Sequence, residues 1–82
     1  MEYPPLVNCS GQYIARALVR LEGFEVKKGS KHFWKVCHTA TNKCFMLPNR
    51  KPLKKGLVWS MVRDFLEPLG YSDEDIFKEI WC

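Results

Sequence analysis

The sequence predicts a small α+β domain in which two helices cover one face of a three-stranded antiparallel sheet. In residues 12–21 and 56–66, apolar side chains recur every three or four positions, as on amphipathic helices. Between them, residues 24–28, 32–38 and 43–47 alternate apolar and polar side chains, which is typical of strands in a half-covered sheet. The predicted order is therefore helix, three strands, helix, followed by a short C-terminal helix.

The first helix has a clear start and a clear end in the sequence. Ser10 is a good N-cap, and Gly23 suits the left-handed position after a helix. Residues 1–9 contain a Pro-Pro pair, which predicts an extended lead-in, so residues 10–82 form the single predicted domain. The apolar stripe of the helix consists of Tyr13, Ile14, Ala17, Leu18 and Leu21.

The three strands are predicted to form two consecutive hairpins. Gly29-Ser30 supplies the first turn, and residues 39–42 supply the second. If His38 pairs with Lys43, Val36 opposes Phe45 and Trp34 opposes Leu47, which gives one apolar face. His32 then begins the second strand on that face, at the open end of the hairpin. Trp34 is expected in the core, whereas Phe33 points to the opposite face.

The second helix is predicted to begin at Gly56, with Lys54 and Lys55 at its N-terminus. Free backbone N–H groups and the helix dipole favour an anion at that end. The apolar side is formed by Leu57, Met61, Phe65 and Leu66. Ser72 and Asp75 resemble a capping box for the last helix, so its acidic first turn needs no catalytic explanation.

Charge is distributed unevenly along the chain. Residues 27–63 contain ten basic side chains and no acidic one, whereas residues 64–82 contain six acids and only Lys78 as a base. Such a block is self-repulsive, and its usual use is to bind an anionic partner. RNA or DNA phosphate is the first candidate. The alternatives are an ordinary solvated lysine-rich surface and a surface that docks an acidic protein.

The four cysteines, Cys9, Cys37, Cys44 and Cys82, lack the spacing of a structural zinc site. Cys37 and Cys44 can face each other across a hairpin beside His38, which leaves metal binding open. Reduced thiols are the favoured interpretation, because nothing in the sequence indicates secretion. The N-terminus lacks a signal-peptide pattern, and no apolar run approaches the ~20 residues of a membrane span. We therefore expect a soluble cytoplasmic protein with no membrane association.

Three stretches resemble the HicA (YcfA-like) family, the small mRNA interferase toxins of prokaryotic toxin–antitoxin pairs. They are "SGQYIARALVRLEGFEV", "KKGSKHFWKV" and "LPNRKPLKKGLVWSMVRDFLEPLGYSDEDIF", which together run from about Ser10 to Ile80. The Gly-Ser-x-His segment and the "LKKG" start of the second helix are the more specific parts. Many members carry histidine directly after Gly-Ser, where this chain has Lys31, whereas others carry it one position later, as here.

The resemblance implies a double-stranded-RNA-binding-domain-like fold and cofactor-free, metal-independent cleavage of mRNA. It also implies a HicB-like antitoxin as the protein partner. The histidine that cleavage requires maps onto His32, and Gly29 belongs to the motif turn. The residues expected to contact RNA are Lys28, Ser30, Lys31, Lys35, Lys54 and Lys55.

RNA cleavage can proceed without a metal because the 2′-hydroxyl of RNA is itself the nucleophile. An imidazole with a pKa near ~6.5 is suited to remove its proton, and nearby lysines can offset charge on the phosphorane. For stacking on a base, Phe33 is a better candidate than Trp34, which is expected in the core. Two alternatives stay open: His32 as an ordinary turn residue, and the whole protein as a non-catalytic RNA-binding module.

Overall fold

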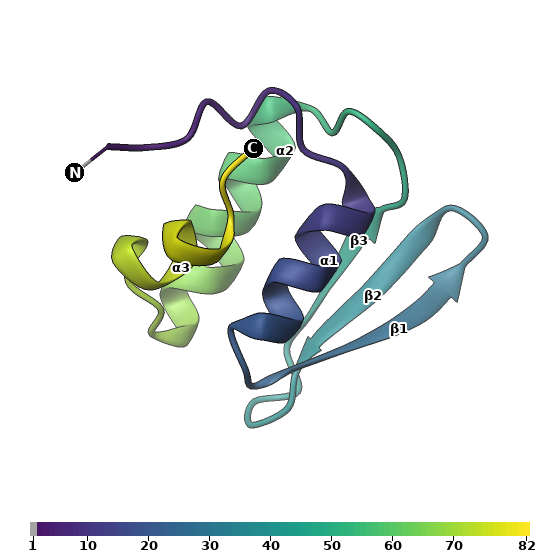
Figure 1. Cartoon of the computed structure of the whole chain (residues 1–82). Helices are drawn as coiled ribbons and strands as arrows, with labels where there is room; N and C mark the ends of the chain where they lie inside the picture. Colours follow the sequence, from purple (N-terminus) through teal and green to yellow (C-terminus); the bar gives the residue numbers. More distant parts are fainter. Residues whose placement is uncertain (1) are drawn as a thin grey trace.

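A computed structural model describes residues 2–82 and confirms the predicted α+β fold (Figure 1). The chain forms one three-stranded antiparallel sheet with the strand order β1-β2-β3. A π-helical segment, Met61–Leu66, and a 3₁₀ turn, Glu67–Leu69, continue the second helix without a break. The elements are α1 (Gly11–Arg20), β1 (Phe24–Ser30), β2 (Phe33–His38), β3 (Cys44–Pro48), α2 (Lys55–Ser60) and α3 (Asp73–Glu79).

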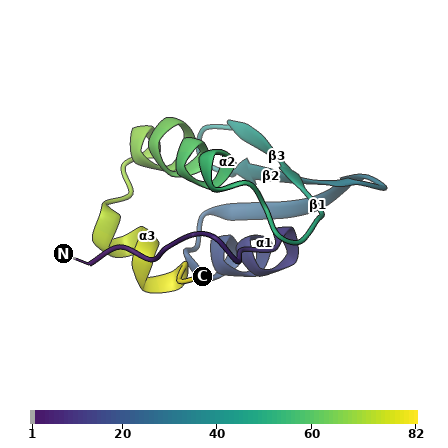
Figure 2. The same cartoon turned by 90° about the horizontal axis from the view of Figure 1, so that it is seen from above.

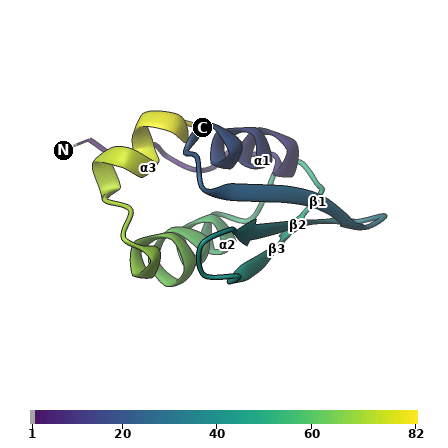
Figure 3. The same cartoon turned by 90° about the horizontal axis from the view of Figure 1, so that it is seen from below.

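The helices lie together on one side of the molecule, and the β1–β2 hairpin extends away from them (Figure 1). Figures 2 and 3 show α3 beside α1, at the end of the molecule opposite the β1–β2 turn. The inner face of the sheet contributes Phe24, Val36 and Leu47 to the core. The buried helical side chains that meet them include Ile14, Leu18, Val58, Met61, Val62, Phe65 and Leu66.

The predicted register between β2 and β3 is confirmed. Val36 pairs with Phe45 and Trp34 with Leu47, and the amide of His38 donates to the carbonyl of Lys43 at 2.8 Å. Apolar residues therefore fall on a single face of these two strands. The indole Nε1 of Trp34 is buried there without a hydrogen-bond partner in the described part of the chain.

The predicted position of the first turn is wrong. Strand β1 continues through Gly29 to Ser30, and the turn is made by Lys31 and His32. Lys28 pairs with Trp34 and Ser30 with Phe33, so Gly29 has no cross-strand partner and forms a β-bulge. Glycine fits there because a Cβ would lie 3.1 Å from the terminal methyl of Met46. His32 consequently precedes β2 and is not part of it.

The predicted helix ends are confirmed to within one or two residues. The Ser10 hydroxyl accepts a hydrogen bond from the amide of Tyr13 at 3.0 Å. Ser72 and Asp75 form the predicted capping box at the start of α3. The second helix begins at Lys55 and not at Gly56, with Lys54 as its N-cap.

Residues 2–9 of the lead-in form no helix or strand, and part of this segment packs against the domain. The side chains of Leu6 and Cys9 are fully buried. The amide of Leu6 donates to the carbonyl of Cys82 at 2.7 Å, and the amide of Leu53 donates to the carbonyl of Cys9 at 2.6 Å. Residues 6–9 therefore complete one side of the core.

The prediction of free thiols is wrong, because all four cysteines form disulfides. Cys9 is bonded to Cys82, and Cys37 is bonded to Cys44. The first pair forms because the lead-in meets the C-terminal segment, a tertiary contact that no local pattern indicates. The second pair forms because Cys37 and Cys44 are direct cross-strand partners. Within residues 2–82, no three side chains of the metal-binding types are grouped as a metal site.

None of the helices described in residues 2–82 has both the length and the apolar character needed to cross a bilayer.

Candidate functional site

His32 lies at the tip of the β1–β2 hairpin and is held there through its backbone. Its amide donates to the Ser30 hydroxyl at 3.3 Å, and its carbonyl accepts from the amide of Asn49 at 2.7 Å. The imidazole is exposed and has no hydrogen-bond partner in the part of the chain that the structure describes. The backbone of His32 is thus fixed on both sides, whereas its side chain is free to contact a ligand.

Asn49 belongs to the loop of residues 49–54, which connects β3 to α2. This loop is itself attached to the N-terminal part of the domain, because the carbonyl of Arg50 accepts from the amide of Gly11 at 3.0 Å. The bond from Leu53 to Cys9 holds its other end. The hairpin tip is therefore connected to the core through the loop as well as through its own strands.

The predicted cations near His32 do not all share one surface. Lys28 pairs with Trp34, on the side of the sheet that the helices cover, whereas Lys35 pairs with Lys27 on the open side. Successive side chains of a strand point to opposite faces, so Lys28 and Lys35 point away from each other. Lys31 lies in the turn beside His32. We call Lys28, Ser30, Lys31 and His32 the hairpin-tip cluster.

Lys54 and Lys55 lie at the start of α2, as predicted. The carbonyl of Lys54 accepts from the amides of Leu57 and Val58, at 3.0 and 3.2 Å. Figures 1 and 2 show the start of α2 and the β1–β2 turn in separate parts of the molecule. The structure therefore places the predicted RNA-binding residues in separate groups, and it does not bring Lys54 and Lys55 against His32.

Three acidic side chains of the C-terminal part of the chain are paired with arginines. Arg63 forms ion pairs with Glu67 at 2.9 Å and with Asp73 at 3.0 Å. Arg20 pairs with Glu79 at 2.8 Å. The hydrogen bond that Arg63 donates to Glu67, assisted by Asp73, raises the pKa of Arg63 further above its already high value. Among the described residues, the one acidic partner of a lysine in the β1–β2 hairpin is Glu25, which lies 3.6 Å from Lys27, so basic side chains remain in excess there.

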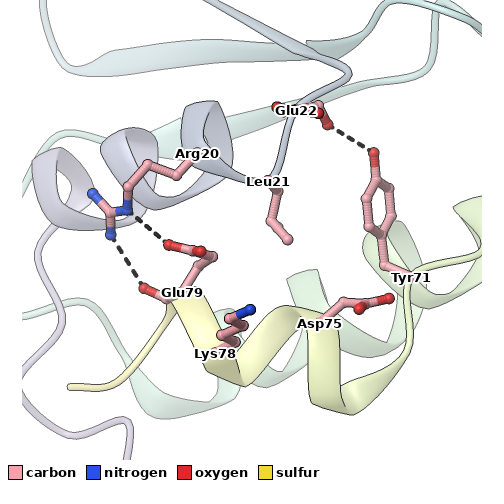
Figure 4. A pocket seen from close by; sticks show the side chains of 7 residues that line it. All are labelled: Arg20, Leu21, Glu22, Tyr71, Asp75, Lys78 and Glu79. Atoms are coloured by element: carbon pink, nitrogen blue, oxygen red, sulfur yellow. Dashed lines mark hydrogen bonds and ion pairs between the residues drawn. The ribbon is translucent and has the colours of Figure 1, made fainter.

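A hollow of about 360 Å³ lies between the end of α1 and α3 (Figure 4). Several of its polar groups are bonded to one another: Arg20 contacts Glu79, and the Tyr71 hydroxyl donates to the Glu22 carbonyl at 2.9 Å. Burial, with a smaller effect of Asp75, raises the pKa of Tyr71. The walls are formed by Arg20, Leu21, Glu22, Tyr71, Asp75, Lys78 and Glu79, none of which the sequence indicates as functional.

His38 is held by contacts with neighbouring side chains, and the sequence predicts no functional role for it. Its Nδ1 lies 2.9 Å from the Thr41 hydroxyl. Its ring packs against Phe24, with the ring centres 5.2 Å apart, and meets the edge of Tyr71. These contacts hold the second hairpin against the helices, which leaves His32 as the histidine available for chemistry.

The open face of the sheet carries Lys27 and Met46, which the sequence-based site omitted, beside Phe33 and Lys35, which it included. Phe33 and Met46 are 37% and 47% exposed, and Lys27 lies directly opposite Lys35. Strand alternation already predicts Phe33 on this face, and the same pattern places Met46 there. Asn49 was also missed, because its contact with His32 is made by the backbone and has no residue signature.

Comparisons of the chain with family models, with curated proteins and with solved structures find no match. The resemblance to HicA toxins therefore depends on the sequence motifs quoted above. The Gly-Ser-x-His motif spans the bulge and the turn of the β1–β2 hairpin, and "LKKG" spans the start of α2.

Proposed function

We propose that the protein is a metal-independent endoribonuclease that cleaves mRNA with His32 as the general base. One observation carries the proposal: the backbone of His32 is fixed by Ser30 and Asn49, while its imidazole is exposed among lysines. A general base needs such a fixed position together with access to its substrate. The Gly-Ser-x-His resemblance supports the same residue.

The proposed reaction uses the 2′-hydroxyl of RNA as the nucleophile. His32 takes the proton from this hydroxyl, the 2′-oxygen attacks the adjacent phosphorus, and the 5′-oxygen leaves and takes a proton from water. The products are a 2′,3′-cyclic phosphate and a 5′-hydroxyl. Lys28, near the end of β1, and Lys31, in the turn, offset the negative charge that develops on the phosphoryl oxygens. General-base assistance of this kind is typically worth ~10²–10⁴-fold in rate, which suits a toxin that needs few cuts per message.

The same proposal assigns the protein to type II toxin–antitoxin systems, with a HicB-like antitoxin as its inhibitor and the cytoplasm as its location. Cytoplasmic thiol pools keep most protein cysteines reduced. A toxin acting there must therefore keep its fold after the Cys9–Cys82 and Cys37–Cys44 bonds are reduced. This requirement is measurable with the purified protein.

The direct test is to incubate the protein with end-labelled RNA in the presence of EDTA and to look for discrete fragments. We expect cleavage by the wild type and none by His32→Ala, with RNA binding retained. His38→Gln is the matched control, because this histidine contacts Thr41 and lies in the second hairpin. Cleavage by His32→Ala at the wild-type rate would remove His32 from the mechanism.

Two other outcomes separate the competing functions. Salt-sensitive RNA binding without fragments from the wild type would indicate a non-catalytic RNA-binding module. Association with an acidic protein, and none with RNA, would indicate that the lysines serve protein docking. Both results contradict the proposed nuclease activity.

A further inference from the structure

The open face of the sheet combines unpaired positive charge with exposed apolar side chains. From this combination we infer that it binds single-stranded RNA, with a base stacked on Phe33 and phosphates at Lys35 and Lys27. The inference deepens the proposed function, because it names the form of RNA that is bound and the surface that binds it. It concerns the open face and not the hairpin-tip cluster.

The first observation is a pair of like charges at a cross-strand position. Lys27 and Lys35 are direct partners in β1 and β2, and like charges in that arrangement destabilise a sheet. Lys27 is relieved only by Glu25, whose carboxylate lies 3.6 Å away in a well-exposed and therefore weak ion pair. Lys35 has no acidic partner within 4.0 Å in the part of the chain that the structure describes. A bound phosphate would neutralise this repulsion.

The second observation is that the unpaired lysine is flanked by exposed apolar side chains. Met46 lies directly opposite Lys35 on β3, and Phe33 lies two residues before Lys35 on the same strand. Side chains two apart on a strand are about 6.7 Å apart on the same face. Gly29, at the bulge, has no side chain to fill this area. A Cβ at that position would lie 3.3 Å from the Cβ of Lys35.

These features favour a single strand over a duplex. An aromatic ring on an exposed sheet face can stack only on a base that is not already stacked and paired, and such bases occur in single strands. Lysines beside the ring can then contact the phosphates that connect successive bases. A duplex would offer phosphates to Lys27 and Lys35 but no base face to Phe33.

The test measures RNA binding by fluorescence anisotropy, in a His32→Ala background so that cleavage cannot interfere. The probes are a labelled ten-nucleotide single strand and a labelled duplex of the same length. We expect the single strand to bind more tightly, and Phe33→Ala to weaken its binding roughly 5–150-fold, the range that loss of one stacked base gives. Lys35→Gln should lower the salt slope for the single strand by about 0.7.

Two variants make the test specific. Phe33→Leu keeps the apolar character of the side chain but lacks the ring, so we expect it to bind as weakly as Phe33→Ala. Val19→Ala removes a comparably exposed apolar side chain from α1, 54% exposed, and should leave binding unchanged. Circular dichroism of each variant checks that the fold is kept.

The inference is overturned if Phe33→Leu binds like the wild type, if the duplex binds as tightly as the single strand, or if only an acidic peptide such as poly-glutamate binds. Its failure is distinct from failure of the proposed nuclease. RNA fragments from the wild type with Phe33-independent binding would reject the open face and keep His32. Phe33-dependent binding without fragments would keep the open face and reject catalysis.

Discussion

The backbone amide of Asn49 donates a hydrogen bond to the carbonyl oxygen of His32 at 2.7 Å, which joins the loop before α2 to the β1–β2 turn. The bond involves no side chain, so no sequence motif marks Asn49 as the residue that holds the candidate base, His32, in place. Lys31 and His32, which form the tip, are both exposed, and this contact links the tip to the loop that precedes α2.

We predict that Asn49→Pro lowers RNA cleavage while the protein stays folded. Proline has no N–H, so the carbonyl of His32 loses its donor and the turn loses its attachment to the loop. A typical hydrogen bond contributes about 0.5–1.5 kcal/mol, so urea denaturation should detect only a modest loss of stability. Cleavage should fall more than stability does, because the position of the base changes.

Asn49→Ala is the control for this substitution, since it removes the side chain and keeps the amide donor. We expect its cleavage rate to match that of the wild type. Equal loss of activity in Asn49→Ala and Asn49→Pro would mean that the side chain of Asn49, and not its backbone bond, matters. Amide hydrogen exchange of Lys31 and His32 should increase in the proline variant only.

The two disulfides should contribute unequally to stability. In the chain-entropy description a crosslink stabilises more as its loop lengthens, and the sequence separations here are 73 and 7 residues. This predicts about 4.4 kcal/mol for Cys9–Cys82 and about 2.4 kcal/mol for Cys37–Cys44. Urea denaturation of Cys9→Ala/Cys82→Ala and of Cys37→Ala/Cys44→Ala, each compared with the oxidised wild type, measures both values. An equal or reversed order would contradict the chain-entropy description.

The order of reduction should be the opposite of the order of stabilisation. Cys9 is fully buried, whereas Cys44 is exposed on the open face. Graded reduction followed by alkylation and mass spectrometry should therefore label Cys37 and Cys44 first. If the fold is lost once both bonds are reduced, the proposed cytoplasmic location is untenable.

Stability should decline at alkaline pH through Tyr71. Burial, followed by the carboxylate of Asp75, raises the pKa of its phenol above the ordinary value of 10.0. The folded protein therefore holds this proton more tightly than the unfolded chain does. The resulting contribution is fully present below pH 10 and is lost as the pH rises through the folded-state pKa.

The measurement is the free energy of unfolding in urea at pH 8 and at pH 10.5, for the wild type and for Tyr71→Phe. The variant loses the bond to the Glu22 carbonyl and should be less stable at pH 8. Its further loss between the two pH values should be smaller than that of the wild type. An identical decline in both proteins would show that other groups, such as the lysines, account for it.

The sequence predicted the elements of this fold because each has a local cause. The Ser10 cap, the Ser72–Asp75 capping box and the alternation around Val36 and Phe45 are short-range patterns, and the structure contains all of them. The turn between β1 and β2 was misplaced because glycine occurs both in turns and at β-bulges. A Gly-Ser pair ordinarily indicates a turn, but here glycine serves at a bulge where Met46 and Lys35 crowd the backbone.

The candidate site was less predictable because its parts depend on register and on long-range contacts. The expected RNA-contacting residues grouped Lys28 with Lys35, although strand alternation sends their side chains to opposite faces of the sheet. The contact between Asn49 and His32 and the bond between Cys9 and Cys82 join segments that are distant in the chain. No periodicity reports such contacts.

The Cys9–Cys82 bond also determines how the protein responds to mechanical force. A pull on the lead-in and on the C-terminal segment passes from Cys9 directly to Cys82 through the covalent bond. The sheet and the helices between these two residues then carry no load, and only residues outside the bond can be extended. After reduction the same pull acts on the bond from Leu6 to Cys82 and then on the core. The redox state of one cysteine pair therefore decides whether the domain behaves as a closed loop or as an extensible chain.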